Sequence, residues 1–72
     1  MIKMIVDYKN KEIKIGDKVK IVDDVPTSDG MLYEGNVVKI DEFNLIDKKI
    51  RVTDLLGKIW WIEPNKVSVS FK

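Results

Sequence analysis

The sequence predicts an all-β domain, because apolar residues recur at every second position and no stretch has a helical period. The alternating runs are short, and Gly, Pro, Asn and Asp separate them, as is typical of turns between strands. Several short strands in one small domain favour a closed or nearly closed barrel, which also hides the edges of strands rich in Ile and Val. We therefore expect a small β-barrel of five strands.

Residues 1–15 predict an N-terminal β-hairpin or arm that precedes the barrel, which we place at residues 16–72. A polar turn, Lys9-Asn10-Lys11, separates two alternating runs. The apolar positions of these runs are Ile2, Met4, Val6, Ile13 and Ile15.

The five barrel strands are expected at residues 18–22, 34–40, 49–53, 58–62 and 67–71. Residues 23–33 predict a long loop, because they contain Pro26 and the turn sequence Ser28-Asp29-Gly30. Residues 63–66 predict a 3₁₀ turn before the last strand, since proline fits a first helical turn and asparagine often ends one.

The stretch from residue 42 to residue 47 predicts a short loop that carries two apolar side chains, Phe43 and Leu45. These side chains either fold back over one end of the barrel, which we favour, or form an exposed patch for a partner.

The register of the hairpin in residues 49–62 decides which tryptophan is buried. A four-residue loop, Asp54-Leu55-Leu56-Gly57, would place Arg51 opposite Trp60, and residues directly opposite each other share a face of the sheet. We therefore expect Trp61 in the core and Trp60 on the outer face beside Arg51. A bulge at Gly57 would shift the register by one residue and exchange the two tryptophans.

Composition excludes several functional classes. The 72 residues form one domain with a thin core, and they include no Cys and no His. Disulfides, thiolate metal sites and the commonest general base are therefore absent. The formal net charge of +1 is a poor match to a strongly basic nucleic-acid binder. The first eight residues are too short and too charged for a signal peptide or a membrane span, so we expect a cytoplasmic protein.

No motif predicts an enzyme. The Ser and Thr hydroxyls have no histidine to activate them, and the four Gly residues are isolated rather than forming a phosphate loop. The carboxylates of Asp23, Asp24 and Asp29 could hold a calcium ion, but their spacing does not match an EF-hand loop. We favour a solvated loop, and we predict no metal site and no cofactor.

The order of five segments resembles an SH3-like barrel over residues 16–71. The segments are GDKVKI (16–21), EGNVVKI (34–40), KIRV (49–52), GKIWW (57–61) and EPNKV (63–67). The first two, with Gly35, are similar to the KOW-type variant of ribosomal and transcription-elongation proteins. In that variant the loop before the second strand is usually basic, whereas here it carries four carboxylates and no Lys or Arg. Lys66 occupies the position of the corner Tyr of peptide-binding SH3 domains.

The candidate binding residues are Trp60, Arg51, Tyr33 and Phe43. An aromatic anchor beside a cation is typical of interface hot spots, although the same pair could merely cover the sheet. The leading hypothesis is a non-enzymatic protein that docks onto a larger protein, as a monomer or a weak homodimer. The alternatives are a KOW-like module that binds RNA or DNA, and a structural subunit of a complex. The short, Lys-, Ile- and Asp-rich chain also resembles small proteins of phages and mobile elements.

Overall fold

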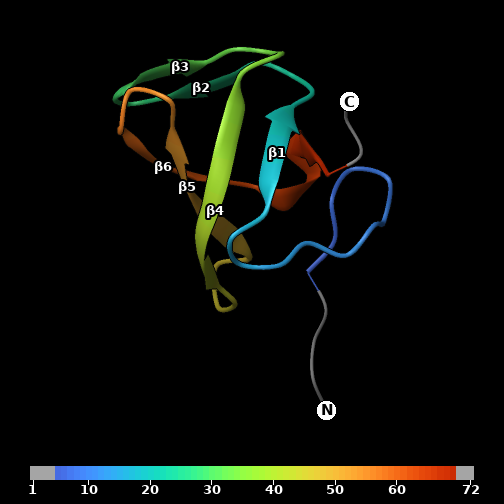
Figure 1. Cartoon of the computed structure of the whole chain (residues 1–72). Helices are drawn as coiled ribbons and strands as arrows, with labels where there is room; N and C mark the ends of the chain where they lie inside the picture. Colours follow the sequence, from blue (N-terminus) through green and yellow to red (C-terminus); the bar gives the residue numbers. More distant parts are fainter. Residues whose placement is uncertain (1–4, 70–72) are drawn as a thin grey trace.

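The computed structural model describes residues 5–69, and these form an all-β domain, as predicted (Figure 1). A five-stranded antiparallel sheet is accompanied by a separate two-stranded hairpin. The strands are β1 (Lys18–Ile21), β2 (Val25–Thr27), β3 (Gly30–Leu32), β4 (Val37–Asn44), β5 (Lys49–Asp54), β6 (Ile59–Ile62) and β7 (Val67–Ser68). The predicted 3₁₀ turn, η1 (Pro64–Lys66), precedes β7.

The sheet has the strand order β6-β5-β4-β1-β7 and does not close into a barrel. In residues 5–69, β6 and β7 form the two ends of the sheet and pair only with β5 and β1. Of the expected closed or nearly closed barrel, the structure therefore confirms the all-β domain but not the closure. Among residues 5–69, β7 pairs with β1 at two positions, Lys20 with Ser68 and Ile21 with Val67, and no pairing joins β7 to β6.

The strands in the second half of the chain lie close to their predicted positions, whereas β4 is shifted along the chain. It begins at Val37 because Gly35, with φ +92°, and Asn36 form a turn in which the Asn36 N–H donates to the Tyr33 carbonyl. It continues to Asn44, through part of the predicted 42–47 loop. The last two residues of the predicted strand 67–71 lie outside the described chain.

The predicted loop at residues 23–33 contains a hairpin that the sequence analysis missed. Strands β2 and β3 pair with Val25 opposite Leu32 and Thr27 opposite Gly30. The Thr27 hydroxyl accepts a hydrogen bond from the Asp29 N–H and donates one to the Gly30 carbonyl, which closes the turn. Figure 1 shows this hairpin at the top of the molecule, beyond the ends of β4 and β1.

A bulge in β4 sets the direction of Phe43. Ile40 lies opposite Val52 but Glu42 lies opposite Arg51, so Asp41 is an extra residue in the ladder. The shift turns Phe43, opposite Ile50, toward the core, where it packs partly buried. Phe43 therefore lies in a strand rather than in a loop, whereas Leu45 is half exposed.

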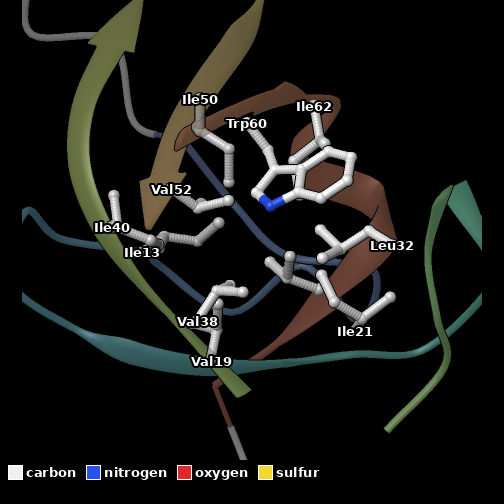
Figure 2. Packing of buried hydrophobic residues seen from close by; sticks show 11 residues of the cluster. Ile13, Val19, Ile21, Leu32, Val38, Ile40, Ile50, Val52, Trp60 and Ile62 are labelled. Carbon is white, nitrogen blue, oxygen red and sulfur yellow. The ribbon is translucent and has the colours of Figure 1, made fainter. Parts of the chain in front are cut away.

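The core consists of alternate side chains from the sheet together with Leu32 from β3 and Ile13 from the N-terminal segment (Figure 2). Its members are Ile13, Val19, Ile21, Leu32, Val38, Ile40, Ile50, Val52, Trp60, Ile62 and Val67. Trp60 is the one aromatic among aliphatic side chains, and it is therefore the largest side chain of this core.

The β5–β6 turn has a three-residue loop, and this reverses the expected tryptophans. The Asp54 N–H donates to the Lys58 carbonyl at 2.9 Å, and the N–H of Gly57, with φ +84°, donates to the Asp54 carbonyl at 3.0 Å. This is a type I turn followed by a glycine bulge. Val52 therefore lies opposite Trp60 and Arg51 opposite Trp61. Trp60 is 6 % exposed and Trp61 is 44 % exposed, so the predicted faces of both are wrong.

The same turn occurs in the N-terminal segment, at Asp7-Tyr8-Lys9-Asn10-Lys11. The Asp7 N–H donates to the Lys11 carbonyl at 2.8 Å, and Asn10, with φ 65°, occupies the position of Gly57. In each turn one aspartate oxygen accepts two backbone N–H groups, and these bonds are all 2.9 Å long. In residues 5–15, the part of the expected hairpin of residues 2–15 that the structure describes, pairing beyond this turn consists of one bridge, between Val6 and Glu12, and the Ile13 N–H donates to the Ile5 carbonyl at 2.8 Å. Residues 1–4 lie outside the described chain.

Replacing Gly57 by alanine should lower the free energy of unfolding by about 1 kcal/mol, because a Cβ is disfavoured at this positive φ. The cost is purely conformational, since no atom lies within 4 Å of the Cβ position. Gly57→Asn should cost less, because asparagine already adopts this conformation at residue 10. Urea unfolding measures both values, and a larger loss for Asn than for Ala would contradict the turn assignment.

Candidate binding surface

Trp61 lies on the outer face of β6 and stands between two hollows. Asn44, Asp47 and Lys49 line the first hollow with Trp61. The second lies between the segment Asp24–Thr27 and the end of β6, and it also contains Lys49, Glu63 and Lys66. We call the residues Asp24, Pro26, Asn44, Asp47, Lys49, Trp61 and Glu63 the Trp61 surface.

Alternation along β6 explains the exposure of this ring. Trp60 and Ile62 point into the core, so Ile59 and Trp61 point outward, and they are 52 % and 44 % exposed. A tryptophan that keeps nearly half of its surface in water contributes little to folding, and its apolar area remains free for a partner.

Arg51 lies opposite Trp61 on the same face, but its charge is already balanced. Its Nη1 atom lies 3.4 Å from Glu42 Oε1, and its Nε atom lies 4.0 Å from Asp41 Oδ2. The bulge brings both carboxylates to this side, and the Thr53 hydroxyl donates a hydrogen bond to Asp41. The structure thus places Arg51 beside the exposed Trp61, whereas the prediction placed it beside Trp60.

Charges of both signs surround Trp61. Lys66 Nζ lies 3.5 Å from Asp23 Oδ2, whereas Lys49 has no ion-pair partner in residues 5–69. Asp24, Asp47 and Glu63 provide negative charge in the same hollows. The surface is therefore polar at its rim, mixed in sign, and apolar at its centre, which is typical of protein interfaces.

The four predicted site residues do not form one site. Trp60 is in the core, and Phe43 is packed against it. Tyr33 is 58 % exposed but lines neither of the hollows beside Trp61. Only Arg51 lies next to the Trp61 surface. The sequence signal that could have located Trp61 is the Asp-x-x-Gly-Lys turn, which fixes the register.

Trp60 is held by polar contacts at the edge of the core. Its indole N–H donates to Asp54 Oδ2 at 3.0 Å, and this bond is the main reason why the pKa of Asp54 is lowered. The backbone N–H groups of Lys58 and Leu56 lower this pKa further. Lys58 Nζ lies 4.3 Å from the centroid of the Trp60 ring and donates to the Asp29 carbonyl at 2.7 Å. These contacts join the β5–β6 turn to the β2–β3 hairpin.

Asp7 has the corresponding role at the other Asp turn. It is 3 % exposed, and its Oδ2 atom accepts the Val69 N–H at 3.0 Å. Burial raises the pKa of Asp7, but the backbone N–H groups of Val69, Lys11 and Lys9 outweigh burial and lower it overall. The Tyr8 N–H also donates to the Val67 carbonyl at 3.1 Å, so this turn fastens the N-terminal segment to β7.

Comparisons with protein-family models, curated proteins and solved structures found no match. Within residues 5–69, no three acidic side chains converge in a way that could hold a metal ion. Across the same residues there is no helix of the length and hydropathy needed to cross a membrane. The candidate surface therefore rests on the geometry of this chain alone.

Proposed function

We propose that this chain is a non-enzymatic protein that docks onto a larger protein through the Trp61 surface. The observation that carries the proposal is the exposure of Trp61 between two hollows on the outer face of the sheet. Tryptophan and arginine dominate interface hot spots, and here Trp61 and Arg51 stand side by side in the β5–β6 register.

The charges favour a protein partner over a nucleic acid. Arg51 and Lys66 are paired with carboxylates, and Asp24, Asp47 and Glu63 would face the phosphates of any strand laid over Trp61. Nucleic-acid affinity depends on cations that neutralise phosphates, and Lys49, which has no ion-pair partner in residues 5–69, shares its hollows with Asp47, Asp24 and Glu63. The KOW-like alternative therefore remains second.

We infer an open SH3-like fold. The order β6-β5-β4-β1-β7 and the 3₁₀ turn before β7 support this inference. The β2–β3 hairpin, which lies between β1 and β4 in the sequence, supports it too. Within residues 5–69, the β6 end of this open sheet has no strand partner, which is also compatible with a subunit of a complex.

A photo-crosslinking side chain at position 61 tests the docking proposal. The Trp61→benzoylphenylalanine variant should give one discrete crosslinked protein in a lysate of the source cells, because an exposed tryptophan is conservatively replaced by this aromatic group. Leu45→benzoylphenylalanine is the matched control, since Leu45 is similarly exposed at 51 % but lies outside the Trp61 surface. Equal crosslinking from both positions, or none from position 61, would contradict the proposal.

Nucleic acid should not bind with submicromolar affinity at physiological salt. The formal net charge is only +1, and the loop before β4 is acidic. Fluorescence anisotropy with labelled RNA and DNA oligonucleotides measures this directly. Submicromolar binding that persists at about 150 mM salt would place the KOW-like function above protein docking.

A further inference from the structure

Strand β6 has a free edge that carries hydrogen-bonding backbone groups. It pairs with β5 on one side, and no strand in residues 5–69 pairs with its other side. In an antiparallel pair, hydrogen-bonded and non-hydrogen-bonded positions alternate. Because Asp54 and Lys58 are hydrogen-bonded to each other, Trp60 and Ile62 also bond to β5, and the N–H and C=O groups of Ile59 and Trp61 point away from it.

The four residues of this edge lack the charges, prolines and bulges that normally prevent strand addition. Proteins protect sheet edges with charges, prolines, bulges or very short strands. Strand β6 has the sequence Ile-Trp-Trp-Ile, with no charge, no proline and no bulge. At the opposite end of the sheet, β7 has only two residues, and in the hairpin Pro26 removes a donor from β2.

The free backbone groups and the exposed side chains belong to the same residues. Ile59 and Trp61 both present peptide groups to the edge and apolar side chains to the outer face. The second hollow, about 330 Å³ in volume, lies between the end of β6 and the segment Asp24–Thr27. An extended segment in this hollow would meet the β6 edge on one side and β2 on the other.

We propose that the partner docks through an extended segment that adds as a strand to the β6 edge, with an uncharged apolar side chain placed against Trp61. This inference rests on the proposed docking function and specifies its binding mode. In strand addition the main chain provides affinity, and pockets for alternate side chains provide specificity. The side chain placed against Trp61 is apolar because the exposed ring is the apolar centre of the surface, whereas the charged groups, Lys49 among them, lie at its rim.

A peptide segment fits this edge better than a second copy of the chain. Four strand residues bury far less than the roughly 1,000 Å² that a stable interface between two folded proteins needs. A flexible segment can instead occupy the hollow and reach beyond the edge onto Asn44 and Asp47.

The test begins with a random dodecapeptide library selected on the full chain. Enriched peptides should slow amide exchange of Ile59 and Trp61 by at least about tenfold, while Trp60 and Ile62 are already protected without peptide. Each enriched peptide is made in two N-methylated forms, one methylated at the odd positions and one at the even positions. Only alternate amides of an added strand face β6, so one form should bind about tenfold or more weakly and the other should bind almost as well as the unmethylated peptide. Trp61→Thr should weaken binding, and Leu45→Thr should not.

The possible outcomes separate the binding mode from the docking function. Peptides that bind the Trp61→Thr variant more weakly, but whose two N-methylated forms bind equally well, would overturn strand addition and leave docking intact. The absence of enriched peptides, or enriched peptides that are insensitive to Trp61→Thr, would overturn both. Protection of Ile59 and Trp61 that rises with protein concentration alone would assign the edge to a second copy and overturn the peptide proposal.

Discussion

Replacing Trp60 by alanine should destabilise the domain by about 3–5 kcal/mol, the usual cost of truncating a buried aromatic side chain. The ring is 6 % exposed, and among the buried core residues of the described chain it is the only aromatic side chain. The substitution also removes the indole N–H bond to Asp54 Oδ2 and the ring beneath Lys58 Nζ. A domain of this length is stable by roughly 4–11 kcal/mol, so the variant should be marginal or unfolded.

Trp61→Ala is the matched control for this prediction. It removes a half-exposed ring with the same chemistry, from the adjacent residue, and should cost about 1 kcal/mol or less. Urea unfolding followed by circular dichroism measures both variants without depending on tryptophan fluorescence. Equal losses, or a larger loss for Trp61→Ala, would show that the hairpin register is wrong.

Removing the Asp7 carboxylate should cost about 2–4 kcal/mol at neutral pH. The side chain accepts three backbone hydrogen bonds, from Lys9, Lys11 and Val69, and bonds to a charged acceptor are stronger than neutral ones. Asp7→Ala leaves these donors without their carboxylate acceptor and removes the side-chain bond to Val69, so that the Tyr8–Val67 backbone bond remains to fasten this turn to β7. Asp24→Ala is the control, since that carboxylate accepts one exposed bond, from the Glu34 N–H, and should cost less than about 1 kcal/mol.

The Asp7 contribution should also depend on pH. Its pKa is lowered in the folded state, so its stabilising effect is complete well above its ordinary value of 3.8 and is lost as the pH falls through the folded pKa. The parent chain should therefore lose more stability between pH 7 and pH 3 than Asp7→Ala does. Asp54, whose pKa is also lowered, should contribute to acid unfolding in the same direction. Parallel pH profiles for parent and variant would contradict the role of Asp7.

Local patterns in the sequence were sufficient for the strands but not for the connections between them. Alternation placed β1, β5 and β6 within about one residue, because one face of each strand is buried. It did not reveal the bulge at Asp41, which depends on how β4 and β5 fit together and which turns Phe43 inward. The β2–β3 hairpin was hidden because its strands have three residues each, too few for a periodic pattern.

The candidate site depended on a single residue of register. Asp54 and Gly57 were identified as turn residues, but one fewer loop residue exchanges every side chain between the two faces of β6. The sequence therefore led to Trp60 as the outward tryptophan opposite Arg51, whereas in the structure Trp61 takes that position. The carboxylates that neutralise Arg51 could not be predicted either, because the bulge brings Asp41 and Glu42 to that side.

The solvent accessibility of each tryptophan, measured by fluorescence in a variant that retains only that tryptophan, tests the central claim most directly. Both the core and the docking surface depend on which of the two rings is exposed. The Trp61→Phe variant retains Trp60, and its emission should be blue-shifted and resistant to quenching by iodide. The Trp60→Phe variant retains Trp61, and in its folded state, checked by circular dichroism, its emission should be red-shifted and readily quenched. The opposite pattern, with the Trp61 ring shielded and the Trp60 ring quenched, would contradict the register, the core and the proposed surface together.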